Sequence, residues 1–237
     1  MQLSAPIFRL KRQAKLISRE ARIPLSQALD RLAKKEGFKS WSLLAARASA
    51  HHPTREIFRQ LQAGDLVLLA ARPGHGKTTL SLELMAEAIR SGQRGVFFTF
   101  EYNETDIPAL LQSIGETSET LNNRFEIDTS NAISSAYIMN RLQDAPSGTV
   151  AVIDYLQLLD QKRENPPLAE QMTALKSFAQ DHGMIFVFIS QVDRSFELSG
   201  KSLPTLSDVR LPNPLDMAMF NKTCFMNDGQ VRFEAVA

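Results

Sequence analysis

The feature that most constrains the fold of this 237-residue chain is a glycine-containing turn, Ala71-Arg-Pro-Gly-His-Gly-Lys-Thr-Thr79. Residues 65–70 before the turn are almost wholly apolar, as in a strand that is covered on both faces of a parallel sheet. After the turn, apolar residues recur at helical spacing over residues 80–89, until Ser91 and Gly92 end the pattern. A strand, a glycine turn and a helix in this order form the context of a Walker A motif. The stretch therefore predicts an α/β fold with a phosphate-binding turn after its first strand.

The residue types of this turn suit a nucleoside triphosphate with Mg²⁺. Gly74 and Gly76 allow the backbone to curl with its N–H groups inward, and the following helix directs its positive end to the same place. Lys77 would reach the β- and γ-phosphates of ATP, and the hydroxyl of Thr78 would bind Mg²⁺. The residues predicted to bind the nucleotide are Arg72, Pro73, Gly74, His75, Gly76, Lys77, Thr78 and Thr79.

One position departs from the general pattern G-x-x-x-x-G-K-[ST], because Ala71 stands at the first glycine. A small residue with ordinary backbone angles can begin such a turn. The competing interpretation is a glycine turn that is followed by Lys and Thr by chance.

Three polar residues follow other predicted strands and would lie at the same edge of the sheet. Asp154 ends the apolar run 150–153, which is the Walker B arrangement, and it would hold Mg²⁺ together with Thr78. Glu101 follows the second strand directly and could orient or deprotonate the attacking water. Gln191 follows the fifth strand and could contact the γ-phosphate. The alternatives are a turn-capping Asp, a Glu in the first turn of a helix and an ordinary polar strand end.

From Gly64 onward, strand patterns alternate with helix patterns, which implies a mainly parallel sheet covered on both faces. The last quarter loses this rhythm, and Asn227-Asp228-Gly229 between two strand-like runs predicts a hairpin. The predicted strands are residues 65–70, 95–100, 125–128, 150–153 and 184–189, and the predicted helices after the turn are near 80–89, 105–114, 133–143 and 168–182.

The net charge of +1 is the sum of a basic N-terminal part and an acidic remainder of the chain. Residues 1–50 contain 11 Lys and Arg against 3 Asp and Glu, whereas the remainder contains 16 against 23. This asymmetry predicts two units with a boundary near His51-His52-Pro53. The first unit is predicted to hold three short helices, one with the apolar stripe Leu10, Ala14, Ile17 and Ala21, one between Pro24 and Gly37, and one capped by Ser40.

The basic surface of the first unit leaves three interpretations open. It could bind a nucleic acid backbone, dock on the acidic second unit, or be a solvated helix surface. The nucleic-acid candidates on the first helix are Lys11, Arg12, Lys15 and Arg19.

The composition favours an ordinary globular protein. No apolar run approaches the roughly 18 residues of a membrane helix, and the N-terminus lacks the pattern of a secretory signal. The single cysteine, Cys224, excludes an internal disulfide and a cysteine metal cluster. A cytoplasmic location without a membrane partner is the expectation.

Five stretches, over about residues 60–210, resemble in order and spacing the RecA-like ATPase domain of the bacterial replicative DNA helicase of the DnaB type. They are G-D-L-V-L-L-A-A-R-P-G-H-G-K-T-T-L, F-F-T-F-E, V-I-D-Y-L-Q-L-L, F-I-S-Q-V-D-R and L-S-D-V-R. The resemblance implies that Glu101 is the catalytic base, that Asp154 serves Mg²⁺ and that Gln191 senses the γ-phosphate. It also implies that the loop with Lys162 and Arg163 faces DNA, although a basic loop is commonly just solvated.

The chain also departs from this family. Residues 1–63 are too short for the family's N-terminal domain and linker helix, so a hexamer is doubtful. The family carries a Lys and an Arg just before an Asn-Gly turn, and these reach the nucleotide of the next subunit. Cys224 and Met226 stand at those places, so the cation would have to come from Lys222 or from a protein partner.

The resulting prediction is a RecA-like α/β P-loop domain over residues 64–237, a linker over 51–63 and a basic helical module over 1–50. The predicted function is binding and hydrolysis of Mg-ATP in connection with DNA. The alternative is a non-hydrolysing ATP sensor that regulates or docks on a protein partner. A recombinase-like or clock-like ATPase is more remote, because the stretches D-Y-L-Q-L and L-S-D-V-R argue against it.

Overall fold

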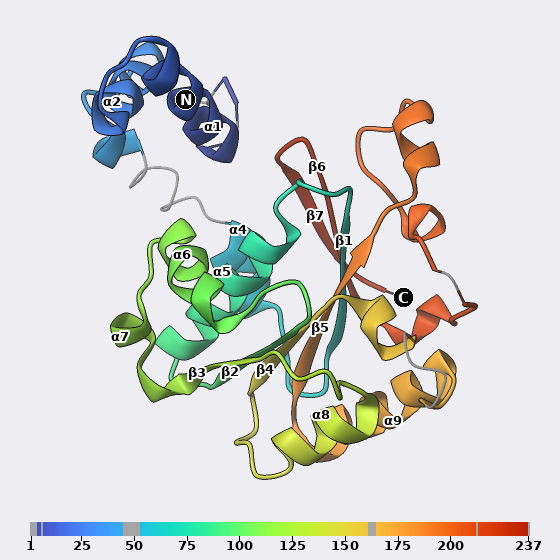
Figure 1. Cartoon of the computed structure of the whole chain (residues 1–237). Coiled ribbons are helices and arrows are strands. Elements are labelled where there is room, and N and C mark those ends of the chain that lie inside the picture. The colour runs from blue at the N-terminus through green and yellow to red at the C-terminus, as the bar shows by residue number, and fades with distance from the viewer. Residues whose placement is uncertain (1–3, 6, 45–52, 161–164, 212, 237) are drawn as a thin grey trace. The chain divides into compact units, whose positions relative to one another are not determined.

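The computed structural model describes residues 4–5, 7–44, 53–160, 165–211 and 213–236 (Figure 1). The chain forms two compact units, Met1–Pro53 and Thr54–Ala237. None of the helices in the described ranges is long and apolar enough to cross a membrane.

The first unit is a small helical module with its own core. Helix α1 (Ile7–Glu20) packs on α2 (Leu25–Lys35), and residues 41–44 are also helical. The expected stripe of α1 is buried at Leu10 and Ala14, whereas Ala21 is exposed because α1 ends at Glu20. The buried partners from the rest of the module are Ala28, Leu32, Ala33 and Leu44.

The second unit is built on a seven-stranded sheet with the order β3-β2-β4-β5-β1-β6-β7. The first six strands are parallel, and β7 runs antiparallel to β6 (Figure 1). The expectation of a mainly parallel α/β sheet is therefore confirmed. The strands are β1 (Leu66–Ala71), β2 (Gly95–Thr99), β3 (Phe125–Asp128), β4 (Val150–Asp154), β5 (Ile185–Gln191), β6 (Lys222–Asn227) and β7 (Gln230–Ala235).

Helices cover both faces of this sheet, because its central strands are apolar on both sides. Helix α5 (Lys77–Arg90) covers one face, and α6 (Ile107–Ser113) and α7 (Ser118–Leu121) pack on α5 (Figure 1). Helices α8 (Ser135–Leu142) and α9 (Leu168–His182) cover the other face. Two buried cores result, and they hold β1, β2, β4 and β5 between them.

Short 3₁₀ helices fill the connections. They are η1 (Glu104–Asp106), η2 (Asn122–Arg124), η3 (Leu156–Asp160), η4 (Arg194–Leu198), η5 (Leu206–Asp208) and η6 (Met217–Met219). The predicted helix over 105–114 thus divides into η1 and α6.

The segment expected to be a linker is partly a helix of the second unit. Helix α4 (Pro53–Arg59) places Ile57 in the buried core beside α5, and Phe58 and Leu61 pack against the same core. The hydroxyl of Thr54 donates to Glu83 Oε2 on α5 at 3.0 Å. The boundary between the two units along the chain therefore falls between residues 53 and 54, and the described residues 54–63 belong to the second unit.

The C-terminal hairpin forms at the predicted position. Asp228 and Gly229 have φ of 48° and 81°, as a two-residue turn with positive φ at both central positions requires. Strand β6 lies parallel to β1, with Met226 opposite Ala71 and Lys222 opposite Val67. The hairpin tip is thus brought to the edge of the sheet at which the glycine turn begins.

Candidate active site

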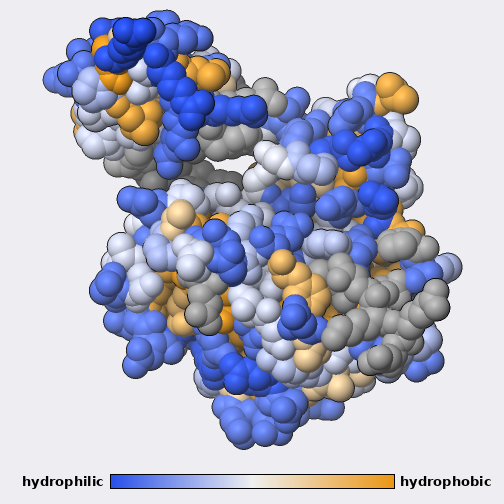
Figure 2. All heavy atoms as spheres, viewed as in Figure 1, coloured by the Kyte–Doolittle hydropathy of each residue, from blue (hydrophilic) through white to orange (hydrophobic). Residues whose placement is uncertain are grey.

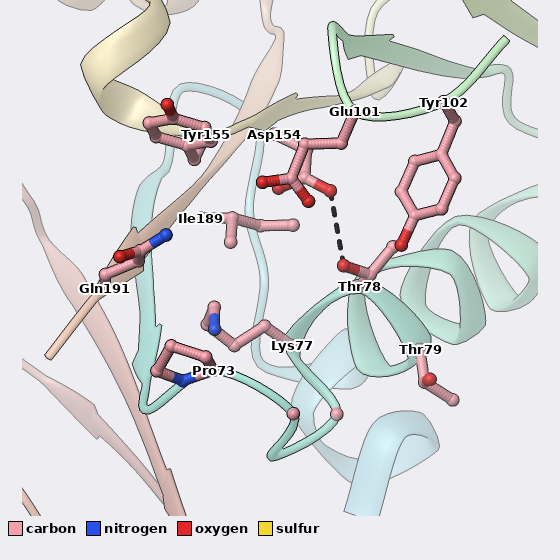
Figure 3. Close-up of a pocket in the computed structure, with 12 residues that line it drawn as sticks. Pro73, Lys77, Thr78, Thr79, Glu101, Tyr102, Asp154, Tyr155, Ile189 and Gln191 are labelled. Atoms are coloured by element: carbon pink, nitrogen blue, oxygen red, sulfur yellow. Dashed lines mark hydrogen bonds between the residues drawn. The ribbon is translucent and has the colours of Figure 1, made fainter.

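An open pocket of about 320 Å³ lies at the carboxyl edge of the parallel strands (Figure 3). This volume is at the lower end of the usual range for small-molecule sites, which is roughly 300–1,000 Å³. The pocket is lined by Pro73, Gly74, Gly76, Lys77, Thr78, Thr79, Glu101, Tyr102, Asp154, Tyr155, Ile189 and Gln191. Most of the residues that the sequence singles out for chemistry therefore come together, from β1, α5, β2, β4 and β5.

The glycine turn has the backbone that a phosphate site needs. Gly74 and Gly76 have φ of 78° and 87°, which side chains other than glycine rarely allow. Gly76 precedes the 14-residue helix α5, whose first turn lines the pocket. The free N–H groups and the positive end of the helix dipole favour an anion there.

Lys77 brings a cation into the pocket. Its Nζ donates to the carbonyl oxygen of Arg72 at 3.2 Å. Burial lowers the pKa of Lys77, while the nearby carboxyl groups of Asp154 and Glu101 oppose this change. A negatively charged ligand would compensate the cost of burying this ammonium group.

Asp154 and Thr78 form the side of the pocket that suits a divalent cation. The hydroxyl of Thr78 donates to Asp154 Oδ2 at 3.2 Å. Asp154 is 2% exposed, and burial raises its pKa to about 7, with a further contribution from the charge of Glu101. A carboxyl group that is destabilised as an anion in this way gains from a bound cation.

The oxygen donors of Thr78 and Asp154 fit Mg²⁺ in particular. In the described part of the chain, no three His, Cys, Asp or Glu side chains gather into a self-sufficient metal site. Mg²⁺ commonly binds through one or two protein oxygens, with phosphates and waters completing its shell. Two protein donors beside a phosphate-binding turn meet this requirement.

Glu101 lies at the open side of the pocket. It is exposed, and its backbone N–H donates to Thr99 Oγ1 at 3.0 Å, at the end of β2. Its carboxyl group points toward Asp154 (Figure 3). A carboxylate at the solvent side of a phosphate pocket can reach a water molecule, which is what a general base requires.

Gln191 faces the same pocket from the end of β5 (Figure 3). Its backbone carbonyl accepts from the N–H of Arg210 at 2.8 Å, so the strand end is tied to the segment after η5. If the Gln191 side chain moved toward a phosphate, it would pull on a strand end whose backbone is held by this hydrogen bond.

Arg72 and His75 differ from the expectation for the nucleotide-binding turn, because their side chains do not line the pocket. Arg72 donates from Nε to Glu197 Oε1 at 2.7 Å and from Nη1 to the carbonyl of Val192 at 3.0 Å. His75 Nδ1 accepts from the backbone N–H of Asp228 at 3.3 Å. These two side chains connect the turn to η4 and to the hairpin tip.

Comparison with known proteins identifies the family. The model of the DnaB-like helicase C terminal domain matches residues 54–114 and 103–213, which together make up more than half of the chain. The chain belongs to the DnaB-like helicase C terminal domain family. The resemblance inferred from the five stretches is confirmed, and it covers residues 54–213 of the second unit.

An individual relative supports the same family assignment. The replicative DNA helicase DnaB of Mycoplasma genitalium is 27% identical over 196 residues, which are 66% of this chain and 42% of that protein. The chain therefore spans less than half the length of this relative.

Solved structures show the same fold. A DnaB-like replicative helicase, described together with its interactions with primase, matches with a TM-score of 0.60 and 19% identity over 92% of this chain and 65% of its own. A second solved structure, which is an ATPase domain, matches with a TM-score of 0.55 and 20% identity over 77% of this chain and 80% of its own. The RecA-like fold class is thereby confirmed.

Three residues of the pocket were missed by the sequence analysis, namely Tyr102, Tyr155 and Ile189. A signal for the two tyrosines existed, because Tyr102 follows Glu101 and Tyr155 follows Asp154 at strand ends. The carboxyl-edge rule that selects the two acids also selects their neighbours.

The nucleic-acid candidates lie elsewhere. Lys11, Arg12, Lys15 and Arg19 are exposed on α1 of the first unit. Lys162 and Arg163 fall outside the described residues. In Figure 2, hydrophilic residues cover much of the visible face of the first unit, with apolar residues between them.

Cys224 and Met226, which the sequence analysis aligns with the family's trans-acting cations, are buried in this chain. Cys224 is 1% exposed and Met226 is 8% exposed, and both belong to the core beside α5. Lys222 pairs with Val67, at the amino end of β1, and so lies at the edge of the sheet opposite to the pocket. Lys222 is therefore remote from the pocket of its own subunit.

Proposed function

We propose that this chain binds and hydrolyses Mg-ATP as a helicase-family ATPase that works in connection with DNA. The observation that carries the proposal is the meeting of Lys77, the pair Thr78 and Asp154, and Glu101 in one pocket. Phosphoryl transfer needs little covalent participation by the protein and depends on positioning and charge stabilisation, which these groups supply.

Each residue has a defined part in this proposal. The turn at 72–79 and the first turn of α5 cradle the phosphates, and Lys77 stabilises negative charge on the β- and γ-phosphates. Thr78 and Asp154 hold Mg²⁺, which neutralises phosphate charge when bound. Glu101 orients a water molecule and accepts its proton, and Gln191 contacts the γ-phosphate.

A sensor that binds ATP without hydrolysis is the second candidate. It is favoured by one observation, the burial of Cys224 and Met226, which the resemblance aligns with the trans-acting cations. The exposed carboxylate of Glu101 in the pocket and the membership of the helicase family favour hydrolysis. Because the relatives are named as replicative DNA helicases, the proposal includes DNA as a partner and the cytoplasm as the location.

The central test is Lys77→Ala. Removing an ammonium group that faces phosphate oxygens should weaken Mg-ATP binding by about 10- to 100-fold, since hydrogen bonds to charged groups contribute about 1.5–3 kcal/mol. Titration calorimetry with a non-hydrolysable ATP analogue measures this change. Lys176→Ala on α9, outside the pocket, is the control and should retain the parent affinity. An unchanged affinity in Lys77→Ala would remove the proposed site.

We further propose that the basic face of α1 contacts the nucleic acid backbone. Arg12, Lys15 and Arg19 are spaced three and four residues apart, so they share one face of the helix, and all are exposed. The exposed side chain of Leu16 lies on the same face, at 51%. The relatives are named as replicative DNA helicases, and this favours a nucleic-acid contact over a solvated surface.

The test is a variant of the 237-residue chain with glutamine at Lys11, Arg12, Lys15 and Arg19. If all four cations contact phosphates of single-stranded DNA, the slope of log K against log salt should fall by about 3, because each contact contributes about 0.7. Fluorescence anisotropy of a labelled oligonucleotide at several salt concentrations measures the slope. A variant with glutamine at Arg55 and Lys176 removes charge outside this face. Equal slopes in the parent and the fourfold variant would favour docking or solvation instead.

A further inference from the structure

Arg72 belongs to the glycine turn, but its side chain holds the strand that ends at Gln191. Strands β1 and β5 pair in parallel up to Ala71 and Gln191, and the N–H of Val192 donates to the carbonyl oxygen of Ala71 at 3.1 Å. The side chain of Arg72 continues this connection, because its Nη1 donates to the carbonyl oxygen of Val192 at 3.0 Å. Both backbone polar groups of Val192 are therefore bound by residues of the turn.

The guanidinium group of Arg72 is fixed in direction by a second contact. Its Nε donates to Glu197 Oε1 on η4 at 2.7 Å, and the side chain of Arg72 is only 15% exposed. A planar guanidinium carries its donors in fixed directions, so contacts at Nε and Nη1 together determine its orientation. The side chain of Glu197 is 62% exposed, and an ion pair with so exposed a partner adds little stability. Its main effect is to direct Nη1 toward Val192.

Arg72 thereby connects the two side chains that are proposed to face the terminal phosphate. Lys77 Nζ donates to the backbone carbonyl oxygen of Arg72 at 3.2 Å, and Gln191 directly precedes Val192. Lys77 and Gln191 both line the pocket (Figure 3). One phosphate group can contact both side chains only if the turn and the end of β5 keep the correct separation.

The end of β5 is also held from its other side. The carbonyl oxygen of Gln191 accepts from the N–H of Arg210 at 2.8 Å, and Val192 forms an antiparallel bridge with Val209. These contacts do not involve the side chain of Arg72. Its removal should therefore leave the strand in the sheet and change only the separation between the strand end and the turn.

We propose that Arg72 is a positioning residue, which sets the separation between the glycine turn and Gln191 and so allows Gln191 to contact the γ-phosphate. The inference rests on the proposed function and deepens it. The α- and β-phosphates are held by the backbone of the turn and by Lys77, neither of which needs the side chain of Arg72. Its removal should therefore weaken the binding of ATP and spare the binding of ADP.

Arg72→Met tests this inference, because it removes every donor of the guanidinium group and retains part of the aliphatic stem. The readout is the dissociation constant of Mg-ADP divided by that of a non-hydrolysable Mg-ATP analogue, both measured by titration calorimetry. We expect this ratio to fall by about three- to tenfold, the usual effect of one lost hydrogen bond. The affinity for Mg-ADP should stay at the parent value.

Arg72→Lys separates the position of the donors from the charge. Lysine retains the positive charge but lacks the planar fork that reaches Val192 and Glu197 together. We expect the ratio to fall in this variant as well, and Arg72→Lys carries the test if Arg72→Met does not fold. A parent ratio in Arg72→Lys would show that the charge alone matters, which would overturn the inference.

A double-mutant cycle with Gln191→Ala identifies the group through which Arg72 acts. Gln191→Ala should lower the ratio by itself, and adding Arg72→Met to it should lower the ratio no further, because the contact that Arg72 positions is already absent. Additive losses would mean that Arg72 acts on the nucleotide without Gln191, and they would overturn the inference. An equal loss of affinity for both nucleotides in Arg72→Met would also overturn it, since that result indicates general damage to the turn.

Arg232→Met is the matched control. Arg232 also donates to a backbone carbonyl, that of Pro204 at 2.8 Å, and pairs with a carboxylate, that of Glu234, but it does not line the pocket or contact the turn. It should leave the ratio at the parent value. If the parent protein binds no nucleotide through Lys77, the proposed function fails and the inference with it. The inference fails alone if Gln191→Ala lowers the ratio and Arg72→Met does not.

Discussion

Glu101→Gln is expected to abolish most ATP hydrolysis while nucleotide binding stays close to that of the parent protein. The amide has the shape of the carboxylate but cannot accept a proton from water. General base catalysis contributes about 10²- to 10⁴-fold, so the single-turnover rate should fall by that factor.

The structure explains why binding should survive this change. Glu101 lies at the exposed side of the pocket, beside Asp154 and apart from the glycine turn. Its charge is one cause of the raised pKa of Asp154, so its removal favours the carboxylate form that holds a cation. Affinity for Mg-ATP should therefore remain the same or increase.

Rapid-quench measurements with labelled ATP, together with the dissociation constant of a non-hydrolysable analogue, check both parts. Glu170→Gln on α9 removes an exposed carboxylate outside the pocket and serves as the control. Equal hydrolysis rates for the parent and Glu101→Gln would mean that Glu101 has no catalytic role and is an ordinary residue of the loop before η1. A loss of both rate and affinity would show that its role is structural.

The sequence alone was sufficient to predict three polar residues at the ends of strands that line the pocket. Asp154, Glu101 and Gln191 lie in one pocket because parallel strands place their carboxyl ends at one edge of the sheet. That rule gives the position of a residue but not the direction of its side chain. Hence Arg72 and His75 were expected in the pocket, whereas their side chains contact Glu197 and the hairpin tip.

Other features depend on contacts between distant segments, which a local pattern does not contain. Helix α4 has seven residues, too few to show a helical period, and only its contact with α5 buries Ile57. The turn after Asn227 predicts the hairpin but not the docking of β6 beside β1. That docking decides the environment of Cys224 and Met226, so their burial could not be read from the sequence.

The burial of Cys224 and Met226 predicts a second large effect, which is slow ATP hydrolysis by the isolated chain. The resemblance implies that a cation from the neighbouring subunit assists hydrolysis, and such a cation contributes about 10³- to 10⁵-fold in phosphoryl transfer. Burial raises the pKa of Cys224 to about 12, so its thiol is neutral, and Met226 is uncharged at any pH. Both pack in the core beside α5.

Turnover should therefore stay slow at every protein concentration, because self-association brings no cation from β6 to the site. It should rise only when a partner protein supplies one. Lys222→Ala should not change the rate, since Lys222 lies at the edge of the sheet opposite to the pocket. Steady-state hydrolysis over a wide concentration range measures this dependence. Sedimentation velocity with Mg-ATP and a strand-displacement assay measure assembly and unwinding.

A result that contradicts this prediction would also identify the structural change behind it. A stable hexamer that unwinds DNA, with turnover that depends on Lys222, would mean that β6 leaves its place beside β1 in the assembly. That movement would break the register between β6 and β1 and expose Cys224, which a thiol reagent would detect upon addition of Mg-ATP. Continued protection of Cys224 in the presence of nucleotide would instead support a hairpin that stays in its own domain, so that an efficient reaction requires a cation from another protein.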